Sequence, residues 1–523
     1  MSGARAAGLD CAAVDTLELT GRSLAVEDVE RVALGEVRVV LGASAADQIE
    51  ASRALIERAV ESGTPTYGVN TGFGRFVDVA ISREDVGRLQ LNLLRSHACA
   101  VGEPFPTEVV RGAMLLRANA LATGASGVRR ETVELLLAMV NAGVHPVVPS
   151  RGSLGASGDL APLAHLALPL VGEGRAEYGG ELLDGGAALG RAGLVPVQLS
   201  AKEGLALING TQFMAAIGAL VLSRAARLVR IADIAAAQSV EAVRASRTPF
   251  APEIQALRPH PGQLASAANL YALLDSSEIN ESHRWCGRVQ DAYSLRCSPQ
   301  VHGACRDAIA YARSVVAIEL NAATDNPLVF ADRDEVLSNG NFHGEPVAIA
   351  LDTLKIALAE LAGISERRIE RMVNPTMSEG LPPFLAEQGG LNSGFMIPHY
   401  VAASLVAENK VLCHPASVDS IPTSAGQEDH VSMGATAAVH AWQVCANVER
   451  VLAVELLCGA QGLDFLAPLR PGPGIAALHA ALRATSPHLG DDRSLSADIE
   501  TVAGQVRDGA LVAAVEAARS PLQ

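Results

Sequence analysis

The segment GATAAVHAWQVCANVERVLAVELLCGAQGL, residues Gly434–Leu463, continues for 30 residues without a proline. Alanine, leucine and valine dominate it, and small or unbranched side chains of this kind favour helices. A helix of this length exceeds the usual range of about 8–20 residues in globular proteins. The segment therefore predicts a long rod that packs against other rods in a bundle.

Further helical patterns lie upstream of this segment. Four are also long and contain no proline after their first residue, namely Ile208–Arg244, Val301–Ala323, Pro346–Met372 and Tyr400–Leu412. Shorter patterns occupy the N-terminal part, with helices expected at Ala46–Glu61, Thr107–Ala122 and Glu131–Asn141 and a strand-like piece at Val37–Leu41. The regular alternation of strands and helices that marks a doubly wound fold is absent. The sequence therefore predicts a mainly all-α fold.

We expect three regions along the chain. Residues 1–20 are expected to be a flexible tail, and residues 21–205 a smaller N-terminal region with glycine-rich loops. Residues 206–523 are expected to form the long-helix bundle.

Charge and hydropathy exclude several classes of partner. The chain of 523 residues has 41 Lys+Arg against 57 Asp+Glu, and no basic run interleaves with aromatic residues, which argues against nucleic acid. The uncharged run Gly204–Ser223 is long enough to cross a bilayer. Its polar residues Asn209, Thr211 and Gln212 would be costly in hydrocarbon, so we expect a buried helix there and no membrane partner. The first residues lack the apolar core of a signal peptide, which indicates a cytoplasmic protein.

The first of two glycine-rich loops is YGVNTGFGRF, Tyr67–Phe76. It matches neither the dinucleotide-binding nor the phosphate-binding glycine pattern. On this evidence a mobile loop and a functional lid both stay open. Tyr67 makes a functional loop more plausible, because a phenol with a lowered pKa can act as a base.

The second loop is GSLGASGDLAPLAH, Gly152–His165. It does not match the nucleophile elbow G-x-S-x-G, because Asp159 stands where the last glycine should be. Its small residues lead to a helix N-terminus, where backbone N–H groups create an electron-poor spot. If the nitrogen of Gly158 attacks the carbonyl carbon of Ala156, a five-membered ring closes, since glycine tolerates the strained backbone. Loss of water then leaves Ser157 as a methylidene electrophile.

A set of segments in the same order resembles the aromatic amino acid ammonia-lyases and aminomutases. Besides the two loops, they are LINGTQ (Leu207–Gln212), QDAYSLRCSPQ (Gln290–Gln300), NAATDNP (Asn321–Pro327), GNFHGEPVA (Gly340–Ala348) and TSAGQEDHVSMG (Thr423–Gly434). The resemblance implies an all-α homotetramer of long helices, with active sites shared between subunits. It also implies a 4-methylidene-imidazol-5-one (MIO) group that forms autocatalytically from Ala156, Ser157 and Gly158, with no external cofactor and no metal.

The resemblance implies the elimination of ammonia from an α-amino acid to give an α,β-unsaturated acid. The β-hydrogen of such a substrate is scarcely acidic, so an electrophile must assist its removal. By analogy, Tyr67 removes this proton. Tyr293 and Asn209 position and polarise the electrophile.

Three further residues are expected around the substrate. Arg296 holds its carboxylate in the bidentate geometry that a guanidinium favours. Gln290 is expected near its polar groups, and Phe342 packs against the electrophile.

Two positions bear on the identity of the amino acid. Ser96-His97 resembles the histidine-selective members, although some tyrosine aminomutases share this pair. Glu428 is an acid where tyrosine and phenylalanine lyases carry a neutral residue. A carboxylate beside a phenyl ring would be buried without a partner, whereas beside an imidazole it accepts an N–H hydrogen bond. The sequence favours deamination of L-histidine to trans-urocanate, and a tyrosine or phenylalanine ammonia-lyase or aminomutase is the alternative.

Two functions of other classes fit less well. A pyridoxal-phosphate deaminase would need a Schiff-base lysine within an α/β fold, and the expected alternation is missing. A non-catalytic helical scaffold would have no need for Ser157 or Tyr67.

Overall fold

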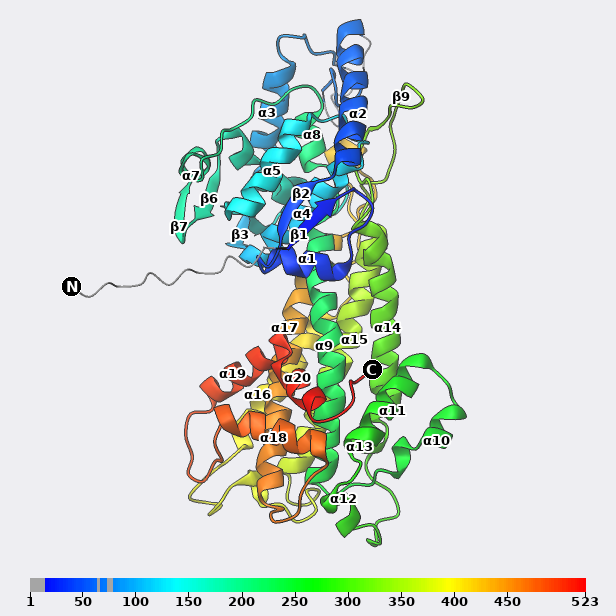
Figure 1. The fold of residues 1–523 in the computed structure, drawn as a ribbon, viewed down its shortest axis with the longest axis vertical. Helices are drawn as coiled ribbons and strands as arrows, with labels where there is room; N and C mark the ends of the chain where they lie inside the picture. The colour runs from blue at the N-terminus through cyan, green and yellow to red at the C-terminus, as the bar shows by residue number, and fades with distance from the viewer. Residues whose placement is uncertain (1–14, 64–65, 73–78) are drawn as a thin grey trace, which may run out of the picture. The chain divides into compact units, whose positions relative to one another are not determined.

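A computed structural model describes residues 15–63, 66–72 and 79–523 of the chain (Figure 1). Helices dominate these residues, and the strands pair only into small sheets of two or three strands. The prediction of a mainly all-α fold is therefore confirmed. Among the described residues, no helix has the length and apolar character needed to cross a bilayer.

The chain divides into two compact units built from non-consecutive segments. The first contains the chain up to Leu220 together with Val315–Ala348 and Ala416–Ala438, and the second contains Val221–Ser314, Ile349–Pro415 and Val439–Gln523. These units differ from the consecutive regions 21–205 and 206–523 expected from the sequence. The difference arises because long helices such as α9 (Gln212–Ala242) and α17 (Gly434–Asp464) belong partly to each unit.

The first unit begins with a small parallel sheet. Strands β1 (Thr16–Leu19) and β2 (Arg38–Leu41) pair in parallel, and α1 (Val26–Ala33) connects them. Residues 1–14 of the expected tail lie outside the described residues, but β1 falls within residues 1–20. The expectation of a tail that reaches residue 20 is thus corrected, because β2 supplies hydrogen-bond partners for the backbone of β1.

Helix α4 (Thr107–Ala122) lies at the centre of the first unit. Every residue from Val109 to Ala122 is buried, as expected for a helix that is surrounded by other elements. Neighbours of α4 include α1, α2 and α5. The other helices and strands of this unit are α2 (Ala43–Ser62), α3 (Val86–His97), β3 (Val101–Pro104), α5 (Arg130–Ala142), β4 (His145–Pro146), β5 (Pro149–Arg151), α6 (Leu160–Ala167), β6 (Arg175–Tyr178), β7 (Glu181–Asp184), α7 (Gly185–Arg191), α8 (Glu203–Ile208), β8 (Leu328–Phe330) and β9 (Glu335–Leu337).

The chain leaves helical geometry between α8 and α9. The single helix predicted over Ile208–Arg244 is incorrect, because α8 gives way to a turn and α9 begins only at Gln212. Asn209 has extended backbone angles, with φ −91° and ψ 106°, and the backbone of Gly210 runs beside that of Gly158. The sequence concealed this break, since the turn lies within the uncharged run Gly204–Ser223 and carries no proline.

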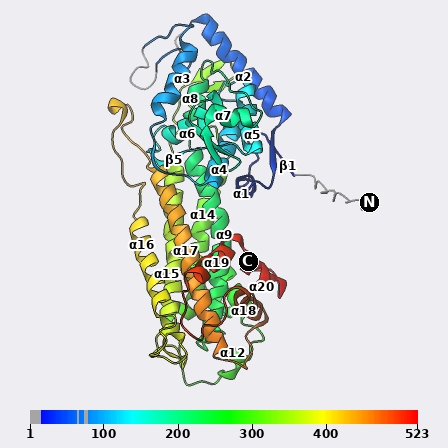
Figure 2. The same cartoon turned by 90° about the vertical axis from the view of Figure 1, so that its left-hand side faces the viewer.

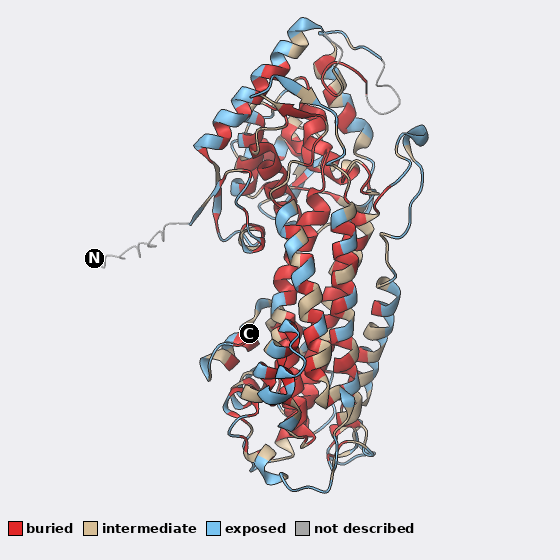
Figure 3. Ribbon diagram, turned by 90° about the vertical axis from the view of Figure 1, so that its right-hand side faces the viewer, coloured by how far each residue is buried: buried red, intermediate tan, exposed pale blue. Residues whose placement is uncertain are grey.

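Long helices dominate the second unit. Figures 1 and 2 show α9, α14, α15 and α17 side by side in it, with α16 next to them, which agrees with the predicted bundle of rods. The faces that these helices turn toward one another are largely buried (Figure 3). Beyond α9 and α17, the helices are α10 (Pro252–Ala256), α11 (Pro261–Leu273), α12 (Glu278–Ser282), α13 (Tyr293–Arg296), α14 (Ser298–Glu319), α15 (Glu345–Val373), α16 (Met396–Leu412), α18 (Pro473–Thr485), α19 (Ser496–Asp508) and α20 (Ala510–Ala517).

A buried ion pair joins three rods of this bundle. Glu455 on α17 accepts hydrogen bonds from Arg368 on α15, at 2.5 Å from Nε and 2.9 Å from Nη2. The hydroxyls of Ser239 on α9 and Ser365 on α15 also donate to its carboxylate, at 2.7 and 2.6 Å. Both charged side chains are fully buried. Because a buried charge is tolerated only with its partners in place, this cluster fixes the register of the three helices.

We predict that Glu455→Gln lowers the free energy of unfolding by about 3–5 kcal/mol, because it leaves the Arg368 guanidinium buried without a counter-charge. Urea denaturation measures the loss. The matched control is Glu500→Gln, which removes a half-exposed partner of Arg450 and should cost less than about 1 kcal/mol. Equal losses in the two variants would contradict a structural role for the buried pair.

Candidate active site

Two cavities of the first unit share one wall. Their volumes are about 860 and 510 Å³. Both are lined by four of the predicted site residues, Tyr67, Ser157, Asn209 and Glu428. Three others line one cavity each, His97 in the larger and Ala156 and Phe342 in the smaller. The structure therefore brings together these seven positions, which come from distant parts of the sequence.

Ser157 lies in a tight loop whose shape depends on glycine. Gly158 has a φ of +75°, and a Cβ atom there would lie 2.1 Å from the carbonyl oxygen of Gly210. The same oxygen accepts a hydrogen bond from the backbone N–H of Asp159, at 2.7 Å. Only glycine can take this conformation at such close range, so backbone contact fixes the position of the loop.

Two later segments of the chain hold the other side of this loop. The backbone N–H of Met433 donates to the carbonyl oxygen of Leu154 at 2.8 Å. The carbonyl oxygen of Gly155 accepts from the N–H of Gly344 at 3.2 Å and from the hydroxyl of Ser432 at 3.1 Å. These bonds explain why both later segments belong to the first unit.

The Asp159 carboxylate is buried beneath the loop. It accepts a hydrogen bond from the backbone N–H of Met214 at 3.0 Å, and another from the hydroxyl of Ser153 at 2.9 Å. Burial raises the pKa of Asp159 to about 6 in spite of these bonds. The side chain thus ties the loop to the first turn of α9. This role of Asp159 was not predicted, although an Asp just before an apolar helix is itself a sign of a helix start.

Glu428 is the acidic group next to Ser157. The Ser157 hydroxyl donates to Glu428 Oε1 at 3.2 Å, and the Thr423 hydroxyl donates to Oε2 at 2.8 Å. Thr423 and Glu428 also exchange backbone hydrogen bonds across a tight turn. Thr423 was not predicted, because nothing in the sequence indicates that this turn folds back on itself.

His97 ends α3 and faces the larger cavity. Its Nδ1 donates to the carbonyl oxygen of Leu93 at 2.9 Å, so in the neutral ring Nε2 is the acceptor. Burial lowers the pKa of His97, while the bond to Leu93 and the nearby Glu428 carboxylate act in the opposite direction. The ring is therefore a neutral hydrogen-bond acceptor at neutral pH, held in one tautomer by the helix.

Asn209 lies in the turn between α8 and α9 and is 3% exposed. Its carbonyl oxygen accepts a hydrogen bond from Arg117 Nη1 at 2.7 Å. Its side-chain Oδ1 is buried and has no hydrogen-bond partner among the described residues. A buried acceptor oxygen of this kind needs a donor, and none of the described side chains around it supplies one.

Tyr67 lies at the start of the first glycine-rich loop and is half-buried. Gly68 follows it with a φ of +74°, and a Cβ there would lie 2.6 Å from the Leu205 side chain. The turn that carries Tyr67 is thus packed against α8. The rest of this loop lies partly in residues 73–78, which are outside the described residues. The two interpretations of the loop, as a mobile loop or as a functional lid, therefore both stay predictions.

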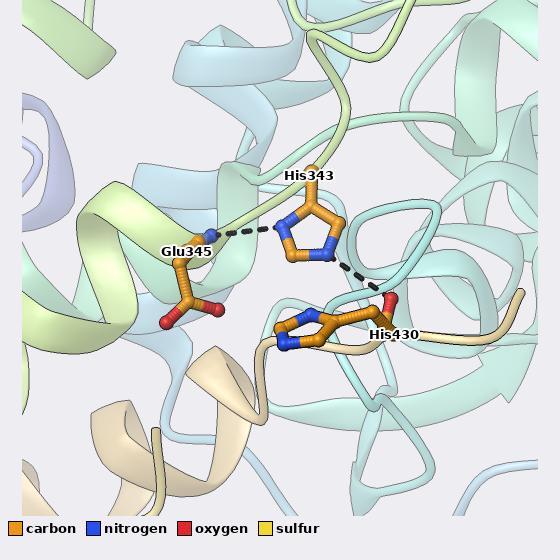
Figure 4. A group of neighbouring side chains, drawn as sticks. All are labelled: His343, Glu345 and His430. Atoms are coloured by element: carbon orange, nitrogen blue, oxygen red, sulfur yellow. Dashed lines mark hydrogen bonds between the residues drawn. The ribbon is translucent and has the colours of Figure 1, made fainter. Parts of the chain in front are cut away.

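Another group of side chains, His343, Glu345 and His430, offers ligand atoms within 4.8 Å of one another (Figure 4). The His343 ring already has two partners, however. Its Nδ1 accepts from the Glu345 N–H at 3.3 Å, and its Nε2 donates to the carbonyl oxygen of His430 at 3.1 Å. Because Nδ1 faces an N–H group, the ring proton is on Nε2, and a metal ion there would have to displace it. The ring instead joins the start of α15 to the segment that carries Glu428.

The three remaining predicted residues belong to the second unit, where they lie together on and before α13. Arg296 Nη2 donates to Gln290 Oε1 at 2.9 Å. The Arg296 guanidinium lies 4.8 Å from the centre of the Tyr293 ring, and Tyr293 is 72% exposed. Their approach to Ser157 stays a prediction from the sequence resemblance.

Comparisons with known proteins agree with this arrangement. Residues 24–484 match the family model described as aromatic amino acid lyase. The chain is 60% identical over 504 residues to a histidine ammonia-lyase of Gloeobacter violaceus, which covers 96% of this chain and 98% of that protein. The crystal structure of histidine ammonia-lyase from Trypanosoma cruzi has a TM-score of 0.90 at 46% identity, covering 96% of both chains. That of tyrosine aminomutase from Streptomyces globisporus has a TM-score of 0.92 at 39% identity, covering 97% of this chain and 100% of that one.

We predict that Gly158→Ala destabilises the protein more than Gly180→Ala does. Both glycines have a positive φ, +75° and +78°, so both substitutions cost about 1–2 kcal/mol of backbone strain. Only the new methyl group at 158 meets a neighbour, the carbonyl oxygen of Gly210, since Gly180 has open space around it. Urea denaturation of the two variants measures the difference, and equal losses would show that the Gly158–Gly210 contact is not tight.

Proposed function

Since the chain belongs to the aromatic amino acid lyase family, we propose that it eliminates ammonia from L-histidine to give trans-urocanate, a carbon–nitrogen lyase reaction. Its histidine ammonia-lyase relatives, which match nearly the whole chain, support L-histidine as the substrate. Within the structure, the observation that carries the proposal is the Ser157 hydroxyl. It lies where the two cavities meet and donates to a carboxylate, Glu428.

We propose further that Ala156, Ser157 and Gly158 form the MIO group autocatalytically. The family and its structural relatives are enzymes of the MIO type. The residues present fit such a group, because Gly158 has no side chain to obstruct ring closure and Asn209, which lines the same cavity as Ala156 and Ser157, carries a side-chain NH2 that can donate to the carbonyl oxygen of the group. When formed, the group supplies an electrophile that assists removal of the weakly acidic β-hydrogen.

Three side chains that line the cavities with Ser157 have a part in the proposed reaction, namely Tyr67, Asn209 and Phe342. We assign removal of the β-proton to Tyr67, whose phenol lines both cavities and is thus within reach of a substrate in either. The Asn209 amide positions the electrophile by hydrogen bonding. Phe342 closes the smaller cavity on the side of Ala156.

Selectivity for an imidazole follows from Glu428 and His97 in this proposal. An imidazole N–H of the substrate can donate to Glu428, which receives only hydroxyl donors from Ser157 and Thr423 in the described structure. The neutral His97 ring accepts a second hydrogen bond through Nε2. A phenyl ring offers neither donor and would leave the carboxylate without compensation.

Gln290, Tyr293 and Arg296 complete the site in our proposal. Arg296 holds the substrate carboxylate, Gln290 contacts its polar groups and Tyr293 positions the electrophile. We propose a homotetramer in which these residues reach the site from another subunit, and the exposed Tyr293 ring supports this because large exposed aromatic surface is typical of interfaces. The cytoplasmic location expected from the sequence belongs to the same proposal.

We predict that the purified protein converts L-histidine and not L-phenylalanine or L-tyrosine, as followed by near-UV absorbance of the unsaturated product. Ser157→Ala should abolish turnover, and intact-mass analysis should show that it keeps the two water molecules that the wild-type chain loses on ring formation. Ser150→Ala, a serine of the same region outside both cavities, is the control. If product forms only from L-tyrosine or L-phenylalanine, the proposal of L-histidine as the substrate is wrong and the alternative substrates take its place. Turnover by Ser157→Ala would rule out the backbone electrophile.

We predict that Glu428→Gln lowers kcat/KM for L-histidine by about 10- to 100-fold, since a hydrogen bond to a charged group contributes about 1.5–3 kcal/mol. L-phenylalanine, as a slow substrate or a competitive inhibitor, should be affected by less than about 3-fold, because its ring makes no such bond. Asp419→Asn removes an exposed carboxylate of the same segment and should leave both values unchanged. Equal losses for the two amino acids would make Glu428 a general catalytic or structural group rather than a determinant of selectivity.

A further inference from the structure

Arg117 is a buried cation at the centre of the first unit. It lies on α4 and is completely inaccessible to solvent. Burial lowers the pKa of Arg117 to about 10, which leaves it charged at neutral pH. Its Nη1 donates to the carbonyl oxygen of Asn209 at 2.7 Å, while its Nε and Nη2 have no hydrogen-bond partner among the described residues. A buried charge with so few partners is costly, so its presence needs an explanation.

The nearest carboxylate does not belong to Arg117 alone. Asp325 raises the pKa of Arg117 through space, but it makes its ion pair with Lys202 at 2.5 Å. Asp325 and Lys202 are both fully buried. One carboxylate therefore faces two buried cations, and ion pairing cannot be the main task of Arg117.

The hydrogen bond of Arg117 acts instead on the turn between α8 and α9. The carbonyl group of Asn209 belongs to the same peptide unit as the nitrogen of Gly210. A Cβ on Gly210 would lie 2.8 Å from Arg117 Nη1, so this glycine packs directly on the guanidinium. On its other side Gly210 accepts the Asp159 N–H and runs beside Gly158. Arg117 and the Ser157 loop thus contact the same short turn, one through the Asn209 carbonyl group and the other through Gly210.

We propose that Arg117 is a positioning residue of the lyase reaction, which fixes the Asn209 side chain against the Ser157 loop by holding the Asn209 carbonyl group. The inference rests on the proposed function, because it acts through Asn209. The N–H of Asn209 donates to the carbonyl oxygen of Leu205 at 3.0 Å, and Asn209 itself follows a helix of six residues in extended geometry, so the bond from Arg117 holds the other side of its backbone. Loss of the guanidinium bond would let the peptide rotate, and a displacement of about 1 Å near the reacting atoms costs up to about 10²-fold in rate.

Arg111 provides a matched control on the same helix. It is also buried, and it too donates to backbone carbonyl groups, from Nε to Val32 at 2.9 Å and from Nη1 to Val140 at 3.0 Å. It lines a separate cavity of about 1040 Å³ whose lining contains none of the predicted site residues. Arg111 therefore represents an arginine that supports the fold and does not touch the turn.

The first experiment compares Arg117→Lys with Arg111→Lys. Lysine keeps the charge but lacks the planar fork of the guanidinium. For Arg117→Lys we expect kcat for L-histidine to fall by about 10- to 100-fold while KM changes by less than about 3-fold. For Arg111→Lys we expect kcat within about 2-fold of wild type at a similar drop in Tm. Arg117→Met, where it folds, should lose more activity than Arg117→Lys. Equal effects of the two lysine variants on kcat would overturn the proposal.

A double-mutant cycle separates a positioning role from a structural one. If Arg117 acts through Asn209, then Arg117→Lys should cost less than about 3-fold in the Asn209→Ala background, since neighbouring effects of this kind are not additive. The same factor in both backgrounds would overturn the proposal. Full turnover by Asn209→Ala alone would instead refute the proposed role of Asn209.

Intact-mass analysis completes the test. Arg117→Lys should show the loss of two water molecules, as the wild type does, so that its low kcat reflects the reaction. A variant that keeps both water molecules would place the effect of Arg117 in ring formation and overturn a role in turnover.

Discussion

The close approach of two glycine backbones, at Gly158 and Gly210, is the constraint on which the site depends. It brings the loop before α6 against the turn before α9, and neither segment has a side chain in the contact. A hydrogen bond from the Asp159 N–H to the Gly210 carbonyl oxygen, with an N···O distance of 2.7 Å, then holds the two segments together. Because α9 cannot begin until the chain has passed this turn, one backbone contact positions Ser157 and sets the start of a bundle helix.

The first unit places charged groups where an apolar core would be more stable. Four charged residues of this unit are fully buried, namely Asp159, Arg117, Lys202 and Asp325. The raised pKa of Asp159 and the lowered pKa of Arg117 both record the cost of burial. Asp159 accepts from the backbone N–H of Met214 and Arg117 donates to the carbonyl oxygen of Asn209, which apolar side chains cannot do. Burial of these charges lowers the stability of the unit, but their hydrogen bonds fix the backbone next to the site. Such a cost is common where a site must be preorganised.

Local pattern predicted the rods well and the turns poorly. The helix that contains Gly434–Leu463 was predictable because its length, composition and lack of proline are properties of the segment itself. The break at Asn209 and the strand Thr16–Leu19 were not, because both exist only through backbone partners distant in sequence. The same holds within the site, where Ser157 was found by its motif. Arg117 gave no signal, because its hydrogen bond is to the carbonyl group of Asn209, which lies 92 positions away in the turn after α8.

In the proposed function, the choice of substrate depends on which hydrogen-bond acceptors the half-buried His97 and Glu428 leave open. His97 is neutral because burial outweighs the attraction of Glu428, and the Leu93 carbonyl group occupies its Nδ1. These two side chains therefore present one acceptor nitrogen and one carboxylate to the larger cavity. An imidazolium, which carries two N–H groups, can satisfy both acceptors, and a neutral imidazole, which carries one, can satisfy one of them. A phenol has one O–H and a phenyl ring has no donor, so neither can satisfy both acceptors. Selectivity of this kind comes from the cost of an unsatisfied acceptor more than from the shape of the cavity, and it explains why an acid can stand beside Ser157.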